Sequence, residues 1–206
     1  MKSMIVIPHC QSEHHINGMA GGWTNWPLSE LGKRQAENVG NALNKHPNIK
    51  EFSAYTSDLL RSLQTAEIST KILELDLKVA EEFREINIGE ATGKSVEWLR
   101  QNTIPPKDNE TRLDYKDLTG GESRREVQAR IYKKLDSLDA EGVENLLVFT
   151  HGYAATMFIA WFLRLPPEAL EYAHFSTPSG SITELINEEG FGLRVLKRLG
   201  DTRHLV

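Results

Sequence analysis

The stretch "NLLVFTHG", residues 145–152, decides the fold because it combines a buried strand with the start of a helix. Its apolar residues follow one another without alternation, which is typical of strands buried on both faces of a sheet. The run ends in Thr150 and His151, and a helical pattern follows over Tyr153–Leu163. A strand covered on both faces needs helices on both sides, so this stretch indicates an α/β protein.

The rest of the chain repeats this alternation of short apolar strands with longer helical segments. The other predicted strands are Met4–Ile7, Phe52–Thr56, Leu77–Val79, and a closing pair, Ser181–Asn187 and Leu193–Leu199, around the turn "EEGFG". The other predicted helices are Ser29–Leu43, Leu59–Leu73 with Ser57 or Asp58 as its N-cap, Val96–Gln101, and a helix from a capping box at Ser123 to Leu138. We expect a three-layer α/β sandwich, with a mostly parallel sheet flanked by helices on both faces, in one domain over residues 1–206. A polar stretch with proline and glycine pairs predicts an inserted lid or loop region near residues 94–121.

The composition excludes several classes of protein. With a net charge of −5 and a pI near 5.8, the chain lacks the basic character of a nucleic-acid-binding protein, so we expect no nucleic-acid partner. Its single cysteine cannot form an internal disulfide, which favours a reducing cytoplasm. The longest apolar run, Ala155–Leu163, is far shorter than the roughly 20 residues that cross a bilayer, so we expect no membrane partner. The oligomeric state is left open.

Polar residues collect where the predicted strands end. His9 ends the first strand, and Ser57 follows the second, with Arg61 one turn into the next helix. The strand quoted above ends at His151 and Gly152. Ligands of open parallel sheets bind beyond the carboxyl ends of the strands. If these strands are neighbours, two histidines and an arginine meet at one edge of the sheet.

A cluster of this kind suits phosphoryl transfer. A neutral imidazole nitrogen is a nucleophile, so His9 can accept a phosphoryl group and become a phosphohistidine. The phosphoryl oxygens then need positive donors, which Arg61, a protonated His151 and the backbone N–H groups of the following helix would supply. The leaving oxygen needs a proton, and the glycine-punctuated stretch "FREINIGEATG" offers Glu85 and Glu90 for that task.

Six fragments in one order give the chain a resemblance to a known family. They are "PHCQ" at 8–11, "WPLSELG" at 26–32, "SDLLRSLQTA" at 57–66, "REINIGEATG" at 84–93, "GGES" at 120–123 and "VFTHG" at 148–152. In this order and at this spacing they resemble the histidine phosphatase superfamily, the phosphoglycerate-mutase-like proteins, along nearly the whole chain. The resemblance implies an α/β sandwich and a phosphomonoesterase of the histidine (acid) phosphatase type that needs no metal or other cofactor.

The resemblance also implies a role for each matched residue. His9 is the nucleophile that becomes phosphorylated, Arg61 and His151 hold the phosphoryl group, and Glu85 is the proton donor. Further phosphate- or substrate-binding residues are expected at Gln11, His15, Gly22, Ser57 and Gly152. The expected partner is a small phosphorylated substrate.

The chain departs from the family beside the nucleophile. Where relatives have an arginine that grips the phosphate, this chain has Pro8, which offers neither a charge nor an N–H. Losing one donor aimed at developing charge typically lowers the rate by about 10²–10³, so we expect weakened activity. His14 and His15 are candidates to replace the charge as imidazolium ions below about pH 6.5. Cys10 replaces a glycine, either as a thiol of lowered pKa or as a small buried residue.

Three alternatives to a phosphatase stand beside this interpretation. The first is a phosphoglycerate-mutase-type phosphotransferase, which passes the phosphoryl group to an acceptor other than water. The second is a catalytically impaired protein that binds phosphorylated ligands. The third is a zinc site formed by His9, Cys10, His14 and His15. Adjacent His and Cys side chains on an extended segment point to opposite faces, and the spacing matches no usual ligand pattern, so we predict no metal.

Overall fold

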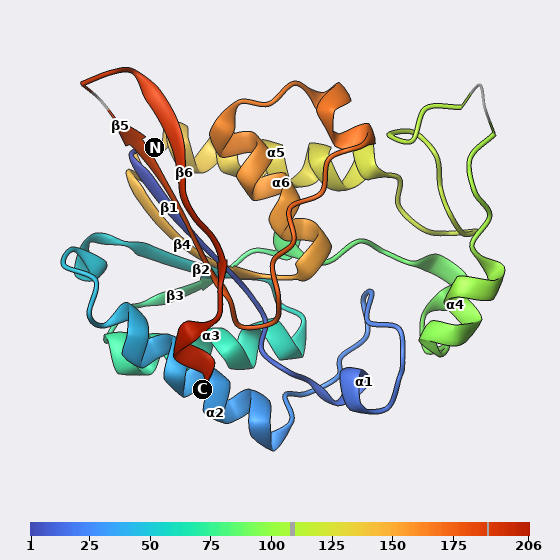
Figure 1. Cartoon of the computed structure of the whole chain (residues 1–206), viewed down its shortest axis with the longest axis horizontal. Coiled ribbons are helices and arrows are strands. Elements are labelled where there is room, and N and C mark those ends of the chain that lie inside the picture. The colour runs from blue at the N-terminus through green and yellow to red at the C-terminus, as the bar shows by residue number, and fades with distance from the viewer. Residues whose placement is uncertain (108–109, 189) are drawn as a thin grey trace.

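A mixed sheet runs through the centre of the molecule (Figure 1). The computed structural model describes residues 1–107, 110–188 and 190–206, and within them the sheet has six strands in the order β3-β2-β4-β1-β5-β6. Their bounds are β1 Ser3–Pro8, β2 Ser53–Thr56, β3 Leu77–Val79, β4 Asn145–Thr150, β5 Ile182–Glu188 and β6 Leu193–Asp201. Strands β3, β2, β4 and β1 are parallel, whereas β5 and β6 complete the sheet with antiparallel pairings. The prediction of a mostly parallel sheet is confirmed.

The register of the parallel strands brings three strand ends to one edge of the sheet. Pro8 of β1 pairs with Thr150 of β4, and β2 ends one residue short of that level. His9, Ser57 and His151 each follow one of these strands, so they leave the sheet close together. This is the carboxyl edge at which open α/β sheets bind their ligands.

Helices cover both faces of the sheet (Figure 1). Their bounds are α1 Glu13–Ile16, α2 Glu30–Leu43, α3 Leu60–Leu73, α4 Val96–Asn102, α5 Arg124–Ala140 and α6 Gly152–Leu163. Short 3₁₀ turns lie at η1 Ile49–Glu51, η2 Glu81–Phe83, η3 Gly89–Ala91, η4 Pro167–Glu171 and η5 Arg203–Leu205. Helices α2 and α3 pack on one face and α5 and α6 on the other, which confirms the three-layer sandwich.

Each face of the sheet has its own hydrophobic core. In β1, Met4 and Val6 point to the cluster under α5 and α6, whereas Ile5 and Ile7 point to the cluster under α2 and α3. Strand β4 divides in the same way, which explains why its sequence is apolar without alternation. Each fully buried side chain of this kind stabilises the fold by about 1.5–3 kcal/mol. The two cores therefore hold the central strands whose ends carry the polar residues.

Two helix starts show how local hydrogen bonds set the boundaries. Ser123 caps α5 as predicted: its Oγ accepts the Glu126 N–H, and the Glu126 carboxylate accepts the Ser123 N–H. The predicted caps of α3, Ser57 or Asp58, are wrong. Ser57 Oγ accepts the Leu59 N–H at 3.1 Å, which places Leu59 at the N-cap and delays the helix by one residue.

The structure also moves the boundary between β4 and α6. The strand ends at Thr150, because His151 is the N-cap of a helix that already begins at Gly152. The one-turn helix α1, Glu13–Ile16, has no counterpart in the prediction, since four residues are too few to show a hydrophobic period. The predicted turn "EEGFG", 188–192, contains residue 189, which lies outside the described residues.

The inserted region near residues 94–121 lies at one end of the sheet, where Figure 1 shows α4 and its loop beside the carboxyl edge. Backbone hydrogen bonds join it to the body: the Ala20 N–H donates to the Lys94 carbonyl, and the Glu90 N–H donates to the Thr119 carbonyl. Residues 108–109 of the insertion lie outside the described part of the chain. That the chain forms a single domain stays a prediction.

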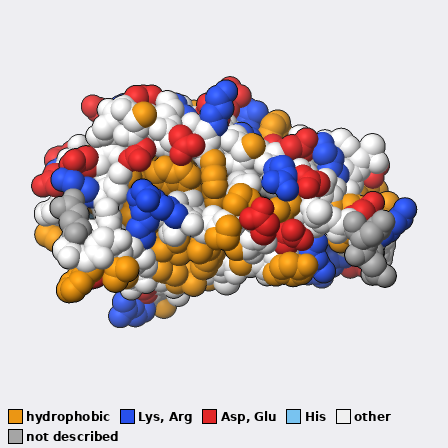
Figure 2. Space-filling model, turned by 90° about the horizontal axis from the view of Figure 1, so that it is seen from above, with side chains coloured by type: hydrophobic (Ala, Val, Ile, Leu, Met, Phe, Trp, Pro, Cys, Tyr) orange, Lys and Arg blue, Asp and Glu red, His pale blue; other side chains and the backbone are white. Residues whose placement is uncertain are grey.

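Helix α6 accounts for the longest apolar run of the sequence. Its buried residues are Ala154, Ala155, Thr156, Met157, Phe158, Ile159, Ala160 and Phe162. On the face of the molecule seen from above, further hydrophobic side chains reach the surface between charged groups (Figure 2). In the described part of the chain, no helix is long and apolar enough to cross a membrane.

Candidate active site

A cavity of about 290 Å³ opens at the carboxyl edge of the sheet. The predicted site residues in its lining are His9, His15, Gly22, Arg61, Glu85 and Gly152. The remaining lining residues are Pro8, His14, Gly21, Ile86, Ile88, Leu99, Thr177 and Ser179. Of these, Thr177 and Ser179 precede β5 and carry no sequence signal that connects them to the other strand ends. The cavity is therefore assembled from segments that only folding brings together.

His9 presents one ring nitrogen to this cavity, and its side chain is almost fully buried. Its Nδ1 lies 2.8 Å from the Cys10 carbonyl oxygen, and because a carbonyl oxygen can only accept, Nδ1 carries the proton. The other nitrogen, Nε2, keeps its lone pair and accepts the Arg61 Nε–H at 3.1 Å. Burial and the charge of Arg61 hold the pKa of His9 well below its ordinary value. His9 is thus a neutral imidazole, and Nε2 is the ring nitrogen that carries a lone pair.

Arg61 is a buried and fixed cation at the start of α3. Its side chain lies 1% exposed, and its Nη1 and Nη2 donate to the carbonyls of Thr24 and Gly22, both at 2.7 Å. Together with the bond to His9, three of the five N–H donors of the guanidinium are used, which leaves two for an anion. Burial lowers the pKa of Arg61 to about 10, so the side chain is still charged at neutral pH.

His151 lies next to His9, with 5.3 Å between the ring centroids, and is fully buried. Its Nε2 lies 2.9 Å from Ser57 Oγ, and no hydrogen-bond partner for its Nδ1 is found among the described residues. Burial, Arg61 and His9 hold the pKa of His151 well below its ordinary value. The expectation of a protonated His151 is therefore wrong for the free protein, because a second buried positive charge beside Arg61 is unfavourable.

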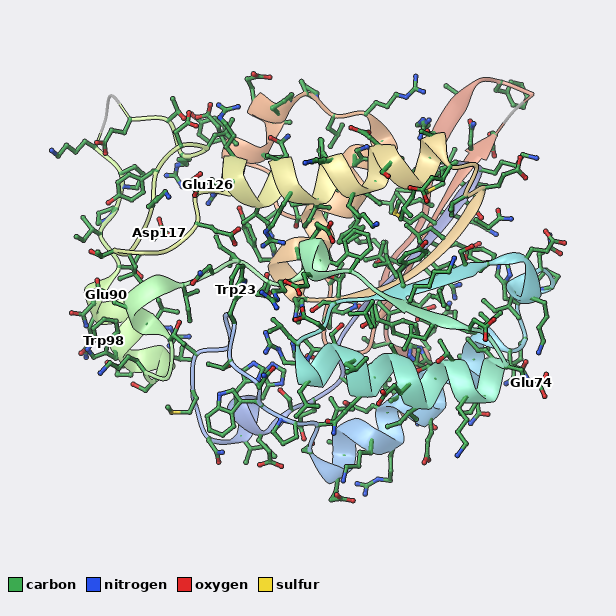
Figure 3. The ribbon with its side chains drawn as sticks, turned by 180° about the vertical axis from the view of Figure 1, so that it is seen from behind. Trp23, Glu74, Glu90, Trp98, Asp117 and Glu126 are labelled. Carbon is green, nitrogen blue, oxygen red and sulfur yellow. The ribbon has the colours of Figure 1, made fainter. Side chains whose placement is uncertain are left out.

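Glu85 is held at the N-terminal end of α6. Its Oε2 accepts the Tyr153 N–H and its Oε1 accepts the Ala154 N–H, each at 3.1 Å, and Oε1 also accepts the Ile86 N–H at 2.9 Å. The first N–H groups of a helix have no partner inside the helix and carry partial positive charge. Oε2 has one donor where Oε1 has two, so Oε2 is the oxygen with room for a proton. Glu90, the other acid considered from the sequence, lies outside the cavity lining and beside α4 (Figure 3).

Arg130 of α5 fixes the loop that carries Glu85. Its Nη groups donate to three backbone carbonyls of that loop, those of Glu82, Arg84 and Glu85, at 2.6–2.9 Å. Its Nε and Nη2 also bind the carboxylate of Glu122, at 2.8 and 2.9 Å. Sequence reasoning missed Arg130, because its position in the helix pattern does not distinguish it from an exposed arginine such as Arg125.

Trp23 supports the same loop from the other side, and Figure 3 shows its side chain directed at the loop. Its Nε1–H donates to the Glu85 carbonyl at 2.6 Å. The guanidinium of Arg84 lies 4.9 Å from the centre of the Trp23 ring, and its Nε donates to Asp58 at 2.7 Å. The "SDLLR" and "FRE" motifs thus meet through the Asp58–Arg84 pair, which leaves Arg84 engaged outside the cavity.

His14 and His15 of α1 lie against His9, with ring centroids 5.6 and 5.4 Å from that of His9. Ser12 holds both rings: its Oγ lies 2.5 Å from His14 Nδ1, and its N–H donates to His15 Nδ1 at 3.2 Å. Burial lowers the pKa of His14 to about 3, and burial together with Arg61 lowers that of His15. The expectation that His14 supplies a positive charge below about pH 6.5 is therefore wrong for the free protein.

Among the described residues of the cavity lining, no second arginine or lysine takes the place of the arginine that Pro8 replaces. Among the described residues, Arg61 is the only one of either type in the cavity lining. The sheet tolerates Pro8 because the His9 N–H donates to Thr150 of β4, so the neighbouring Pro8 nitrogen points to the opposite side. On that side the pairing of β1 with β5 ends at Val6. The missing N–H thus costs the sheet no hydrogen bond, and the loss falls on the cavity.

Three residues near the nucleophile do not line the cavity. Gln11 Oε1 accepts the Ser29 hydroxyl at 2.7 Å, so this side chain secures the start of α2. Ser57 instead contacts His151, as described above. Cys10 is fully buried, and burial raises its pKa to about 12, which makes the alternative of a thiol with lowered pKa wrong. Their contribution to the site is through packing and positioning.

Gly22 and Gly32 are required by close approaches of the backbone to neighbouring atoms. Gly22 has a φ of +45°, and a Cβ on it would lie 2.4 Å from Cγ1 of Ile88. Gly32, in the first turn of α2, lies so close to the loop after His9 that a Cβ would lie 1.8 Å from the Gln11 carbonyl oxygen. A side chain at Gly22 would displace the loop that carries the carbonyl partners of Arg61. A side chain at Gly32 would displace the residues after His9.

The three histidines of the cavity each offer a ring nitrogen within 4.8 Å of the others. The spacing in the sequence separates His9 from Cys10 but does not show that His14 and His15 fold back onto His9. The lone pairs are nevertheless taken by donors: Arg61 Nε–H binds His9 Nε2, and a backbone N–H binds His15 Nδ1. A cation would displace these donors and meet the charge of Arg61, so the arrangement favours an anion.

The fold and the site together define a class: an α/β sandwich with a cavity at the carboxyl edge of the sheet, built around a neutral histidine and a buried arginine. The chain belongs to the histidine phosphatase superfamily (branch 1), whose family model matches residues 4–201. The resemblance drawn from the six sequence fragments is thereby confirmed.

Similar proteins are phosphatases and mutases. A putative phosphoserine phosphatase of Hydrogenobacter thermophilus is 26% identical, with 100% of both chains aligned. A probable phosphoglycerate mutase of Yersinia enterocolitica is also 26% identical, over 100% of this chain and 95% of its own. Among solved structures, the mycobacterial glucosyl-3-phosphoglycerate phosphatase superposes with a TM-score of 0.80 at 21% identity, covering 98% of this chain and 99% of its own. At that identity the structural match shows the fold alone.

Proposed function

We propose that this protein hydrolyses a small phosphate monoester through a phosphohistidine at His9. The observation that carries the proposal is the state of the His9 ring: Nδ1–H is bound to the Cys10 carbonyl, and Nε2 carries the lone pair, which accepts the Arg61 Nε–H in the free protein and must leave that donor to attack phosphorus. A buried arginine and a glutamate at a helix terminus line the same cavity. Phosphatases among the relatives support this reaction type.

In the first step, a bond forms between His9 Nε2 and phosphorus while the ester P–O bond breaks. Arg61 donates its two free N–H groups to the phosphoryl oxygens, and the N–H groups at the start of α6 add partial positive charge. Glu85 gives its proton from Oε2 to the leaving oxygen, which departs as an alcohol.

In the second step, water replaces the alcohol. Glu85 accepts a proton from the water, the water oxygen bonds to phosphorus, and the N–P bond to His9 breaks. Inorganic phosphate leaves, and Glu85 is protonated again for the next cycle. Atoms and protons balance over the two steps, and no metal or other cofactor takes part. We expect this reaction to take place in the cytoplasm.

The activity is weakened because Pro8 supplies no hydrogen-bond donor. Among the described residues that line the cavity, Arg61 is the only arginine or lysine. The same observation favours a second candidate, a protein that binds a phosphorylated ligand and turns it over poorly. A mutase differs only in the acceptor of the second step, and mutases among the relatives keep it as a further candidate.

The test is hydrolysis of para-nitrophenyl phosphate from about pH 4.5 to 8, combined with alkaline quenching after mixing with a ³²P-labelled ester. We expect steady turnover and an acid-labile, base-stable phosphoprotein, both absent in His9→Ala. Turnover that survives in His9→Ala would exclude the phosphohistidine mechanism. Stoichiometric phosphate binding without turnover would favour the binding protein.

A further inference from the structure

A groove of about 660 Å³ lies on the α2 side of the sheet, apart from the catalytic cavity. The two share no lining residue in the part of the chain that the structure describes. The groove is formed by the end of α2, by β5 and β6, and by the turn η5, which Figure 1 shows beside α2. Its charged lining residues are Lys45, Glu184, Lys197, Arg198, Asp201 and Arg203.

Glu184 of β5 is a buried carboxylate in this groove, with 5% of the residue exposed. Its Oε1 accepts a hydrogen bond from Lys197 Nζ at 2.9 Å, and its Oε2 accepts one from Arg198 Nη2 at 2.8 Å. Burial raises the pKa of Glu184, but the bonds from Lys197 and Arg198 outweigh it and hold the pKa below its ordinary value. Glu184 is therefore ionised at neutral pH and fixes two cations in the wall of the groove.

Arg198 of β6 is held between two carboxylates. Besides its bond to Glu184, its Nη1 donates to Asp201 Oδ2 at 3.2 Å. Asp201 also accepts the Nε–H of Arg203 at 2.9 Å. These two bonds occupy two of the five N–H groups of the Arg198 guanidinium, and no item of the described structure other than these carboxylates accepts from the remaining three. Arg198 is thus a preorganised donor with capacity for an anion.

The groove carries more positive than negative charge. Its four lysine and arginine side chains face two carboxylates, so two positive charges are left over, although the whole chain has a net charge of −5. Lys45, which follows α2, is exposed and forms no ion pair with any other described residue. Positive charge concentrated in a concave surface attracts anions, even on a protein whose net charge is negative.

We infer that this groove binds a small polyanion, a molecule with three or more phosphate or carboxylate charges, at a site separate from the catalytic cavity. A ligand with one negative charge gains little, because Glu184 and Asp201 repel it while the cations attract it. A ligand with several anionic groups contacts Lys45 on the α2 wall and the free N–H groups of Arg198 on the strand wall at once. The inference does not depend on the proposed reaction, since His9 lies outside the groove.

The test is calorimetric titration of the full chain and of His9→Ala with tripolyphosphate and with tricarballylate, at about 50 mM salt so that screening is weak. We expect tripolyphosphate or tricarballylate to bind both proteins with a Kd below about 100 μM. The tighter of the two probes then shows whether phosphate or carboxylate groups are preferred. If neither probe binds His9→Ala, the inference is overturned.

A pair of charge reversals assigns the binding to the groove. Lys45→Glu should raise the Kd of the tighter probe at least about tenfold, because it replaces an attraction in the groove by a repulsion. Lys71→Glu is the matched control: Lys71 is an exposed residue of α3 outside the groove, and the substitution changes the net charge by the same amount. It should raise the Kd less than about twofold. Equal effects of the two substitutions would overturn the inference.

Backbone ¹H–¹⁵N spectra of His9→Ala locate the bound probe. Signals from residues 42–47 and 197–204, which contain the walls of the groove, should shift on titration with tripolyphosphate. Shifts confined to residues around the catalytic cavity would overturn the inference, since the probe would then occupy the site already described.

The outcomes separate this inference from the proposed function. If turnover of para-nitrophenyl phosphate depends on His9 but Lys45→Glu leaves the Kd unchanged, the groove is not a polyanion site and the phosphatase stands. If no turnover depends on His9 but Lys45→Glu weakens binding as expected, the proposed function fails and the polyanion site stands.

Discussion

The residues beside the nucleophile determine how strongly this site holds an anion. Pro8 removes one donor, and the free protein keeps His9 and His151 neutral, with His14 neutral above a pKa of about 3. The positive charge of the cavity thus rests on Arg61, which has two free N–H groups. A single charged side chain supplies few hydrogen-bond donors for a phosphoryl group, which has three oxygens.

Restoring the missing donor is the first prediction at this scale. Pro8→Arg should raise kcat/KM for para-nitrophenyl phosphate by about 10²-fold, because a charged donor is returned to the transition state. The substitution also returns an N–H on the side where β5 no longer pairs, so the sheet should be unaffected. Steady-state kinetics measures the gain, and Pro8→Arg/His9→Ala should remain inactive. An unchanged rate would mean that Pro8 does not weaken the site.

The protonation state of His9 is the second prediction. Long-range ¹H–¹⁵N spectra of the free protein should show His9 as the Nδ1–H tautomer, with no titration between pH 8 and about 5.5, because burial and Arg61 hold its pKa well below 6.5. The spectrum of His9→Ala assigns the signals. A His9 ring that takes up a proton near pH 6.5 would contradict the neutral nucleophile.

Among the elements, α6 and α5 share the placement of Glu85. The first turn of α6 supplies two N–H groups to the carboxylate, and Arg130 of α5 binds the backbone carbonyls of the loop. The "GGES" motif belongs to the same arrangement, since Ser123 caps α5 and Glu122 pairs with Arg130. The motif therefore supports Glu85 from outside the cavity.

The third prediction concerns this support. Arg130→Met should lower kcat by at least about tenfold, because Glu85 is no longer held at the leaving oxygen, while the inhibition constant of inorganic phosphate changes by less than about twofold. Arg125→Met is the matched control on the same helix, since Arg125 forms an exposed ion pair with Asp114. Equal effects of the two substitutions on kcat would show that Arg130 has no positioning role.

Over the whole molecule, buried neutral histidines make stability depend on pH. The pKa values of His9 and His151 are held well below 6.5 in the folded protein and return to about 6.5 on unfolding. Below pH 6.5 the unfolded chain therefore binds protons that the folded chain does not, and stability falls as the pH falls. Each of the two contributes about 1.4 kcal/mol per pH unit to this slope.

The fourth prediction follows for urea unfolding between pH 6 and 5. The free energy of unfolding should decrease with falling pH, and His151→Asn should reduce the slope by about 1.4 kcal/mol per pH unit. Asp58 and Asp201 have lowered pKa values in the fold, so their stabilisation is lost only at lower pH, as they protonate. An unchanged slope in His151→Asn would mean that His151 is charged in the folded protein.

Local sequence patterns predict most helices and strands of this molecule. They do not predict the exact residues at which these elements begin and end. The apolar runs of β1 and β4 predict strands within one or two residues, and the capping box at Ser123 predicts the start of α5. The N-cap of α3 was misplaced because Ser57 binds the Leu59 N–H and a histidine ring at the same time. Competing partners of this kind are not visible in a sequence pattern.

The sequence by itself determined the layered α/β fold and the family, because periodicity and motif order are properties of neighbouring residues. The members of the catalytic set stay a prediction. The tertiary structure alone decided which His9 nitrogen carries the proton, that His14 and His151 are neutral, and that Arg130 supports Glu85. These facts depend on burial and on contacts between distant segments, such as the bond from Arg61 to His9 across 52 positions. Solvent exclusion and distance set protonation and hydrogen bonding, and both arise only when the chain has folded.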